Sequence, residues 1–198
     1  MNLLTINGKL KKTNLENMSR VMSFSIPAYK GINGKTTCPF AKDCVKYCYA
    51  KRGNYRFDSV KKGLQKRFEL TKTEEFITIM QAELFMQRPT HVRIHSAGDF
   101  YSPEYIQKWV TLAKQNKNIV FYAYTKSVPL FKGLKLPKNF ITIYSFGSKR
   151  DDLINTKTDR HSKIFKSHEE MKKAGYIDAS DNDLNAISRS KKIGLMYH

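Results

Sequence analysis

Short apolar strands alternate with amphipathic helices along most of this chain, and this alternation constrains the fold more than any other feature. Strand patterns are expected at residues 21–27, 91–95, 119–125, 140–146 and 193–197. Helix patterns are expected at residues 57–72, from 73 to just before Pro89, from Ser102 onward, and near 167–175. Strands separated by helices imply βαβ units and a parallel sheet.

The length of the chain limits how far such a sheet can close. At 198 residues the chain suffices for one domain with a real core, but it is short for a complete eight-stranded barrel. We therefore expect an α/β fold, a partial β/α barrel with a mostly parallel sheet. Residues 1–198 form one domain in this interpretation, and polar residues 1–20 form an irregular lead-in.

Three clusters of reactive residue types follow three of the expected strands. The cysteine segment comes after the first strand, residues 95–99 (His-Ser-Ala-Gly-Asp) follow the second, and residues 125–127 (Thr-Lys-Ser) end the third. Chemistry in parallel sheets sits at the carboxyl ends of the strands. The clusters therefore predict a single shared pocket.

The only cysteines of the chain, Cys38, Cys44 and Cys48, fall within eleven residues. An odd number of cysteines cannot all form disulfides, and the N-terminal residues lack the pattern of a signal peptide. A thiolate metal site in a reducing cytosol is the natural interpretation, and burial as small apolar side chains is the alternative. Three thiolates leave one position open, both in a tetrahedral zinc site and in a 4Fe–4S cluster.

Structural zinc would need a fourth ligand, and His95 or His161 is the candidate. His91 and His95 are four residues apart on an expected strand, too far to hold one ion together. This favours the iron–sulfur cluster over zinc.

The cysteine segment also resembles a known superfamily. Cys44-Val-Lys-Tyr-Cys-Tyr-Ala50 resembles the second half of the signature of radical S-adenosylmethionine (SAM) enzymes, in which an aromatic residue precedes the third cysteine. In that superfamily the three-cysteine loop follows the first strand of a partial barrel and binds a 4Fe–4S cluster, whose open iron is chelated by SAM. The wider arrangement, over most of residues 21–147, is also similar to an uncharacterised group of small phage and mobile-element proteins with a Cys-Pro…Cys…Cys-Tyr-Ala loop.

The resemblance implies roles for individual residues. Cys38, Cys44 and Cys48 would ligate the cluster, and the turn at residues 95–99 resembles the one that holds the SAM amine. Reductive cleavage of SAM would then give a deoxyadenosyl radical that abstracts hydrogen from a substrate. The cysteine spacing departs from the usual signature, with five and then three intervening residues instead of three and then two. The way in which the loop holds the cluster must therefore differ from that in the usual members of the superfamily.

The residues of the pocket admit two interpretations each. Ser96, Gly98 and Asp99 either bind SAM, with Asp99 accepting its ammonium, or simply form a turn before the next helix. Thr125 and Lys126 either stand at the pocket mouth, where Lys126 attracts a carboxylate or phosphate, or end a core strand in a surface loop. The polar strand face with Arg93 points either into the pocket or to solvent.

The charge of the chain bears on its partners. The formal net charge is +19, from 36 Lys and Arg against 17 Asp and Glu, and such a field favours phosphate-rich partners. Basic residues interleave with Tyr49, Tyr55 and Phe57 just after the cysteines, which suits phosphates and stacked bases, although a solvated helix face gives the same pattern. The candidate nucleic-acid-binding residues are Lys51, Arg52, Arg56, Lys62 and Lys66.

Two functions follow as hypotheses. The first is a radical-SAM-like enzyme with a 4Fe–4S cluster and SAM, acting on a nucleic acid or nucleotide. The second is a non-enzymatic nucleic-acid-binding or regulatory protein of a phage or mobile element, stabilised by a cluster or by zinc. No segment approaches the roughly 18 unbroken apolar residues of a membrane helix, so we expect no membrane partner and a cytoplasmic protein, in the host cytoplasm if phage-encoded.

Overall fold

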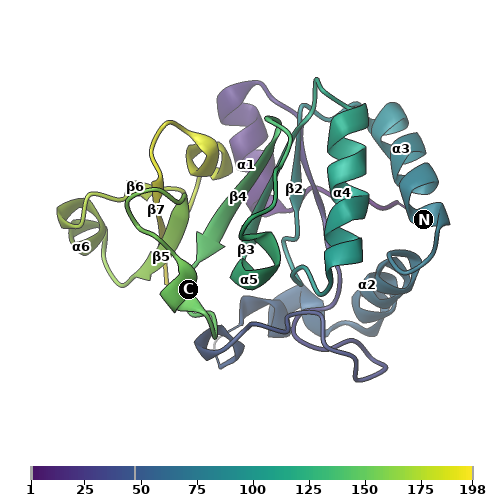
Figure 1. Ribbon diagram of the computed structural model, residues 1–198, viewed down its shortest axis with the longest axis horizontal. Helices are drawn as coiled ribbons and strands as arrows, with labels where there is room; N and C mark the ends of the chain where they lie inside the picture. The colour runs from purple at the N-terminus through teal and green to yellow at the C-terminus, as the bar shows by residue number, and fades with distance from the viewer. Residues whose placement is uncertain (1, 47, 198) are drawn as a thin grey trace.

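The fold is a curved, seven-stranded parallel sheet that forms an open half-barrel (Figure 1). We describe residues 2–46 and 48–197 of a computed structural model. The strand order is β1-β2-β3-β4-β5-β7-β6, and every ladder between these strands is parallel. The strands are β1 (Val21–Phe24), β2 (His91–Ile94), β3 (Val120–Thr125), β4 (Phe140–Ser145), β5 (His161–Phe165), β6 (Ile177–Asp178) and β7 (Lys192–Met196). The predicted partial β/α barrel is confirmed.

Helices cover the two faces of the sheet unequally. The α-helices are α1 (Gly8–Asn17), α2 (Asp58–Leu70), α3 (Glu75–Gln87), α4 (Pro103–Gln115), α5 (Val128–Phe131) and α6 (His168–Lys173). The 3-10 helices are η1 (Asp43–Val45), η2 (Tyr49–Lys51), η3 (Gly53–Arg56), η4 (Asp151–Leu153) and η5 (Asp183–Ile187). Figure 1 shows α2, α3 and α4 on the outer face. None of the helices in the described residues combines the length and apolarity needed to cross a bilayer.

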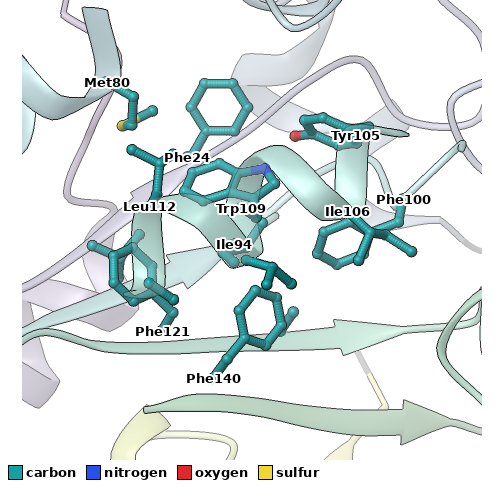
Figure 2. Packing of buried hydrophobic residues seen from close by; sticks show 14 of the residues in the cluster. Phe24, Met80, Ile94, Phe100, Tyr105, Ile106, Trp109, Leu112, Phe121 and Phe140 are labelled. Atoms are coloured by element: carbon teal, nitrogen blue, oxygen red, sulfur yellow. The ribbon is translucent and has the colours of Figure 1, made fainter. Parts of the chain in front are cut away.

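The main core lies between the sheet and helices α2 to α4. Trp109 of α4 is fully buried and its ring meets Phe24 of β1 and Phe76 of α3 edge-on, at centroid distances of 5.3 and 5.5 Å. Figure 2 shows Ile94 and Phe121 of the neighbouring strands packed beside it. Burial of these large rings is the main source of stability on this face.

A smaller core closes one end of the inner face. Leu10 of α1, Val21 of β1 and Ala186 of η5 pack with Tyr122 and Ile193 of the strands. These contacts fill the half-barrel near the amino ends of the strands. The carboxyl ends remain for the loops that carry the cysteines.

The predicted irregular lead-in at residues 1–20 is wrong, because helix α1 occupies Gly8–Asn17. The Asn7 side chain caps this helix by accepting a hydrogen bond from the Leu10 backbone N–H at 2.9 Å. Only Leu10 and Thr13 of the helix are buried, so the sequence carries no apolar periodicity there. By contrast, the start of α4 is confirmed, because Ser102 caps it ahead of Pro103.

Candidate functional site

The cysteine loop, residues 25–57, begins directly after β1 and is fastened to the turn that follows β2. The Ile26 backbone N–H donates to the Ala97 carbonyl at 3.1 Å, and the Asp99 N–H donates to the Thr37 carbonyl at 3.2 Å. The Thr37 hydroxyl in turn donates to the Pro27 carbonyl at 2.6 Å. These bonds fix the position of Cys38, the residue after Thr37.

The same loop also reaches the residues that follow β4, the middle strand of the sheet. Ala41 forms an isolated antiparallel bridge with Ser148, and the Lys149 backbone N–H donates to the Phe40 carbonyl at 2.8 Å. Residues 148 and 149 follow β4, so the loop spans the carboxyl ends of β1 through β4, and Figure 1 shows it running below the sheet. The loop therefore forms a roof over the carboxyl ends of these strands, at the open end of the half-barrel.

A cavity of about 530 Å³ lies between this roof and the inner face of the sheet. Its volume falls within the range of roughly 300–1,000 Å³ typical of small-molecule sites. Its walls include the three cysteines and all five residues predicted to bind a cofactor, namely Cys38, Cys44, Cys48, Ser96, Gly98, Asp99, Thr125 and Lys126. The structure thus gathers, around one cavity, residues that lie up to 88 positions apart (126 − 38) in the sequence.

The sulfur of Cys38 is held by backbone and hydroxyl groups. The Tyr29 N–H lies 3.3 Å from Cys38 Sγ, and the Thr37 hydroxyl lies 3.9 Å from it. Burial, with the nearby charge of Asp99, raises the pKa of the Cys38 thiol to about 12. Burial also raises the pKa of Cys44, against the opposing charge of Lys126. A bound cation would relieve this penalty on the thiolates.

No ready-made site for a single metal ion is present in the described residues. Across residues 2–46 and 48–197, no group of three or more His, Cys, Asp or Glu side chains could hold one ion. His161 uses both ring nitrogens elsewhere, on the Asp159 carbonyl and the Tyr176 hydroxyl, each at 2.9 Å. His95 bonds the Tyr105 hydroxyl through Nε2 at 2.9 Å. Both ring nitrogens of His161 are therefore engaged, whereas Nδ1 of His95, a residue that lines the cavity, has no hydrogen-bond partner among the described residues.

Asp99 joins the ends of β2 and β3. Its Oδ1 accepts from the Thr125 hydroxyl at 2.6 Å and from the Phe100 N–H at 2.8 Å, and its Oδ2 accepts from the Lys126 N–H at 2.8 Å. Burial raises the pKa of Asp99 in spite of these bonds. The Lys126 ammonium bonds the Phe146 carbonyl at 3.1 Å and not the carboxylate.

Gly98 and Ser96 tie the turn to β1 and to the cysteine loop. Gly98 has a φ of +87°, and a Cβ there would collide with Ile26 Cγ1 and come within 3.1 Å of the Ile26 carbonyl oxygen. The Ser96 hydroxyl donates to the Ser23 hydroxyl at 2.8 Å, and its carbonyl accepts from the Tyr49 hydroxyl. Glycine is required at residue 98 by this close packing.

Of the predicted nucleic-acid-binding residues, Arg52 directly precedes η3, Arg56 ends it, and Lys62 and Lys66 are on α2. Arg52, Arg56, Lys62 and Lys66 are all exposed. Two exposed rings accompany them, because Tyr49 is 54% and Phe57 is 60% exposed. The side chain of Lys51 and all of Tyr47 lie outside the described residues.

A buried charge network that no sequence pattern indicated lies at the base of the cavity. Asp183 of η5 is fully buried and pairs with Arg93 at 2.9 Å and with Lys9 of α1 at 2.7 Å. The Tyr122 hydroxyl donates to its second oxygen at 2.5 Å. Polar alternation on β2 left open whether Arg93 faces the pocket or solvent, and the structure places it in the cavity wall, whereas Lys9 and Asp183 carry no local signal.

Comparison with known proteins places the chain among phage proteins. It is 31% identical over 116 residues to the "Gene 88 protein" of Mycobacterium phage L5, a match that covers 52% of this chain and 47% of that protein. The corresponding protein of Mycobacterium phage D29 is 29% identical over the same length, with the same coverage. The match thus spans about half the length of these curated relatives.

No solved structure matches the chain significantly. The expected similarity to a phage protein group is confirmed, because the family model described as gene product 88 matches residues 1–198. The chain belongs to the gene product 88 family.

Proposed function

We propose that Cys38, Cys44 and Cys48 would hold a 4Fe–4S cluster and that SAM would bind beside it in the cavity, as in radical SAM enzymes. The observation that carries this proposal is the gathering of the three cysteines with Asp99 and Lys126 around one cavity, at the carboxyl ends of a parallel half-barrel. Ligand sites in such sheets occupy this position.

The donor set fits a cluster better than it fits a single ion. A lone zinc ion needs four ligand atoms within bonding distance of one centre, and the described residues offer no such group. A cubane cluster takes each protein ligand on a different iron, so it does not require the three sulfur atoms to meet at one centre. The N–H group of Tyr29 directed at Cys38 Sγ suits a cluster thiolate, because hydrogen bonds to sulfur stabilise its charge.

The chain's own residues would bind and orient SAM. When bound, the reduced cluster supplies the electron that cleaves SAM. Asp99 accepts three hydrogen bonds from the protein, and an ionised carboxylate offers about four acceptor positions. One position therefore remains for the ammonium of SAM. Tyr49 and Tyr55, whose rings meet edge-on at 6.2 Å, form an aromatic wall of the cavity.

Metal analysis and a product assay test this proposal. The full chain is purified anaerobically, and its iron, acid-labile sulfide and zinc are measured. Reduced protein is then incubated with SAM and assayed for deoxyadenosine. We expect about four iron and four sulfide per chain, loss of the cluster in Cys38→Ser, Cys44→Ser and Cys48→Ser, and deoxyadenosine from wild type only.

The matched control is Asp43→Asn, an exposed residue of the same loop that does not line the cavity. This variant should keep the full iron content. Zinc without iron would remove the cluster proposal. Iron without deoxyadenosine would remove SAM cleavage and leave the second candidate below.

The second candidate is a nucleic-acid-binding or regulatory protein, in which the metal only fixes the loop. The exposed Tyr49 and Phe57 beside Arg52 and Arg56 favour it, because aromatic and basic side chains together bind stacked bases and phosphates. The same surface would carry a nucleic-acid or nucleotide substrate to an enzyme. Either activity would operate in the reducing host cytoplasm, where free cysteines persist.

A salt titration tests this surface. Binding of single-stranded DNA and RNA is measured against salt concentration for wild type and for Arg52→Ala/Arg56→Ala. Removing two phosphate contacts should flatten the log–log salt slope by about 1 to 2. The control Lys114→Ala/Lys117→Ala removes two exposed lysines from the opposite end of the strands and should leave the slope unchanged. An equal effect of the two double variants would contradict a localised surface.

A further inference from the structure

The base of the cavity carries a group of hydrogen-bond donors that the proposed cluster and SAM do not use. We call Lys9, Arg93 and Tyr124 the basic floor; all three line the cavity. Arg93 lies inside β2, whereas the cysteines lie beyond the strand ends. The floor is therefore deeper in the half-barrel than the cysteine loop.

Two atoms of the floor are buried without a partner. Among the described residues, Arg93 Nε and the Tyr124 hydroxyl form no hydrogen bond. The Arg93 side chain is only 12% exposed, and its guanidinium lies over the Tyr124 ring, 4.9 Å from the centroid. A buried donor without an acceptor costs roughly 1–3 kcal/mol, so two neighbouring ones indicate that an acceptor binds there.

The charges of the basic floor also favour an anion as its ligand. Lys9 and Arg93 bring two positive charges, and Asp183, which pairs with both, brings one negative charge. The third partner of Asp183, Tyr122, is neutral. The first turn of α1, which contains Lys9, has no acidic residue. The network thus keeps an excess positive charge in a confined space, where an anion would be stabilised.

We propose that the basic floor binds an oxyanion group, a carboxylate or a phosphate, of the substrate. The Tyr124 hydroxyl and Arg93 Nε donate to this group, and the Lys9 ammonium balances its charge. Burial raises the pKa of Tyr124, so its hydroxyl keeps the proton that it would donate. The role of the basic floor as a substrate site rests on the proposed function. In that role the floor would hold the acidic end of the substrate, and the rest of the substrate would extend toward the cysteines.

Anion binding itself can be measured without the enzymatic reaction. The full chain, as purified and with its metal content recorded, is titrated calorimetrically with inorganic phosphate and separately with acetate at low ionic strength. We expect saturable one-site binding of at least one of them. Phosphate alone would identify a phosphate ester as the substrate class, and acetate alone would identify a carboxylate.

Tyr124→Phe is the decisive variant. It removes a hydroxyl that has no partner in the described protein, so the stability should stay the same or rise. The anion affinity should nevertheless fall about tenfold, the usual effect of losing one hydrogen bond to a charged group. A purely structural role for Tyr124 would leave the affinity unchanged.

Lys9→Met and Lys11→Met form a matched pair on α1. Lys9 lines the cavity, whereas Lys11 is exposed outside it. Lys9→Met should weaken anion binding about tenfold and Lys11→Met less than twofold. Equal losses in the two variants, or no saturable binding of either anion by wild type, would overturn the proposal. Neither result depends on the iron content, so a failure here is distinct from a failure of the cluster proposal.

Discussion

The hydroxyl of Thr125 donates a 2.6 Å hydrogen bond to Asp99 Oδ1, so the last residue of β3 is fastened to the turn that follows β2. The same turn holds the cysteine loop through the bond from the Asp99 N–H to the Thr37 carbonyl. Asp99 is thus a structural joint of the cavity wall as well as a candidate ligand. Its effect on folding can be separated from its effect on binding.

Asp99→Ala should destabilise the protein by about 3 kcal/mol, because it leaves the Thr125 hydroxyl and two backbone N–H groups without an acceptor. Asp99→Asn keeps the shape and one oxygen, so its loss should be smaller. Urea unfolding of the metal-free chain gives both values. A loss below about 1 kcal/mol for Asp99→Ala would show that the carboxylate is free for a ligand and holds little structure.

Gly98→Ala should cost more stability than Gly133→Ala. Both glycines have a positive φ, +87° and +84°, so each alanine suffers about 1 kcal/mol of backbone strain. Only at residue 98 does the new Cβ collide with Ile26, which adds about 1–3 kcal/mol of overpacking. Urea midpoints of the two variants measure the difference. Equal midpoints would mean that β1 can shift away from the turn.

His95 should make the fold sensitive to acid. Burial lowers the pKa of His95 to about 3, so the native state keeps the ring neutral while the unfolded chain protonates it near pH 6.5. The unfolded state therefore binds more protons between these values. The contribution of His95 to the free energy of unfolding is therefore fully present above about pH 6.5. It is lost as the pH drops toward 3, by up to roughly 4 kcal/mol.

The measurement is the free energy of unfolding against pH for wild type and His95→Gln. The variant removes the titrating ring, so its profile should be flatter between pH 6.5 and 4, whatever its stability at neutral pH. Parallel profiles for the two proteins would contradict the burial of a neutral ring at this position.

Asp183→Ala should unfold much of the protein, whereas Asp181→Ala should have little effect. Asp183 is fully buried between Arg93 and Lys9, and removing it leaves two cations unpaired at a cost of about 3–5 kcal/mol. Asp181 pairs with Lys12 at 3.0 Å but is 81% exposed, so its loss should change stability by less than about 1 kcal/mol. Thermal unfolding followed by circular dichroism compares the two. Similar melting temperatures would show that the Asp183 network is dispensable.

The sequence alone predicted strands β1 to β4 and β7, helices α2 to α4 and α6, and the position of the cysteine loop after β1, but not β5, β6 or α5. Apolar alternation, the cap at Ser102 and the prolines are local signals, and parallel strands bring their carboxyl ends to one edge of a sheet. That rule was sufficient to expect Cys38, Asp99 and Lys126 around one pocket. Helix α1 was not predicted, because only Leu10 and Thr13 of this helix are buried and its sequence therefore lacks the apolar stripe of an amphipathic helix.

Only the tertiary structure decided what each polar side chain contacts. His95 has a φ of +71°, and its ring packs against Phe100 at a centroid distance of 4.7 Å and bonds the Tyr105 hydroxyl, so one side of the ring meets the helix-side core although the residue also lines the cavity. Arg93 and Asp183 are 90 residues apart yet share a buried ion pair. Such pairings depend on how the half-barrel curves and on where η5 and α1 close it. No local propensity encodes that, because the energy of a buried charge is set by its neighbours in space.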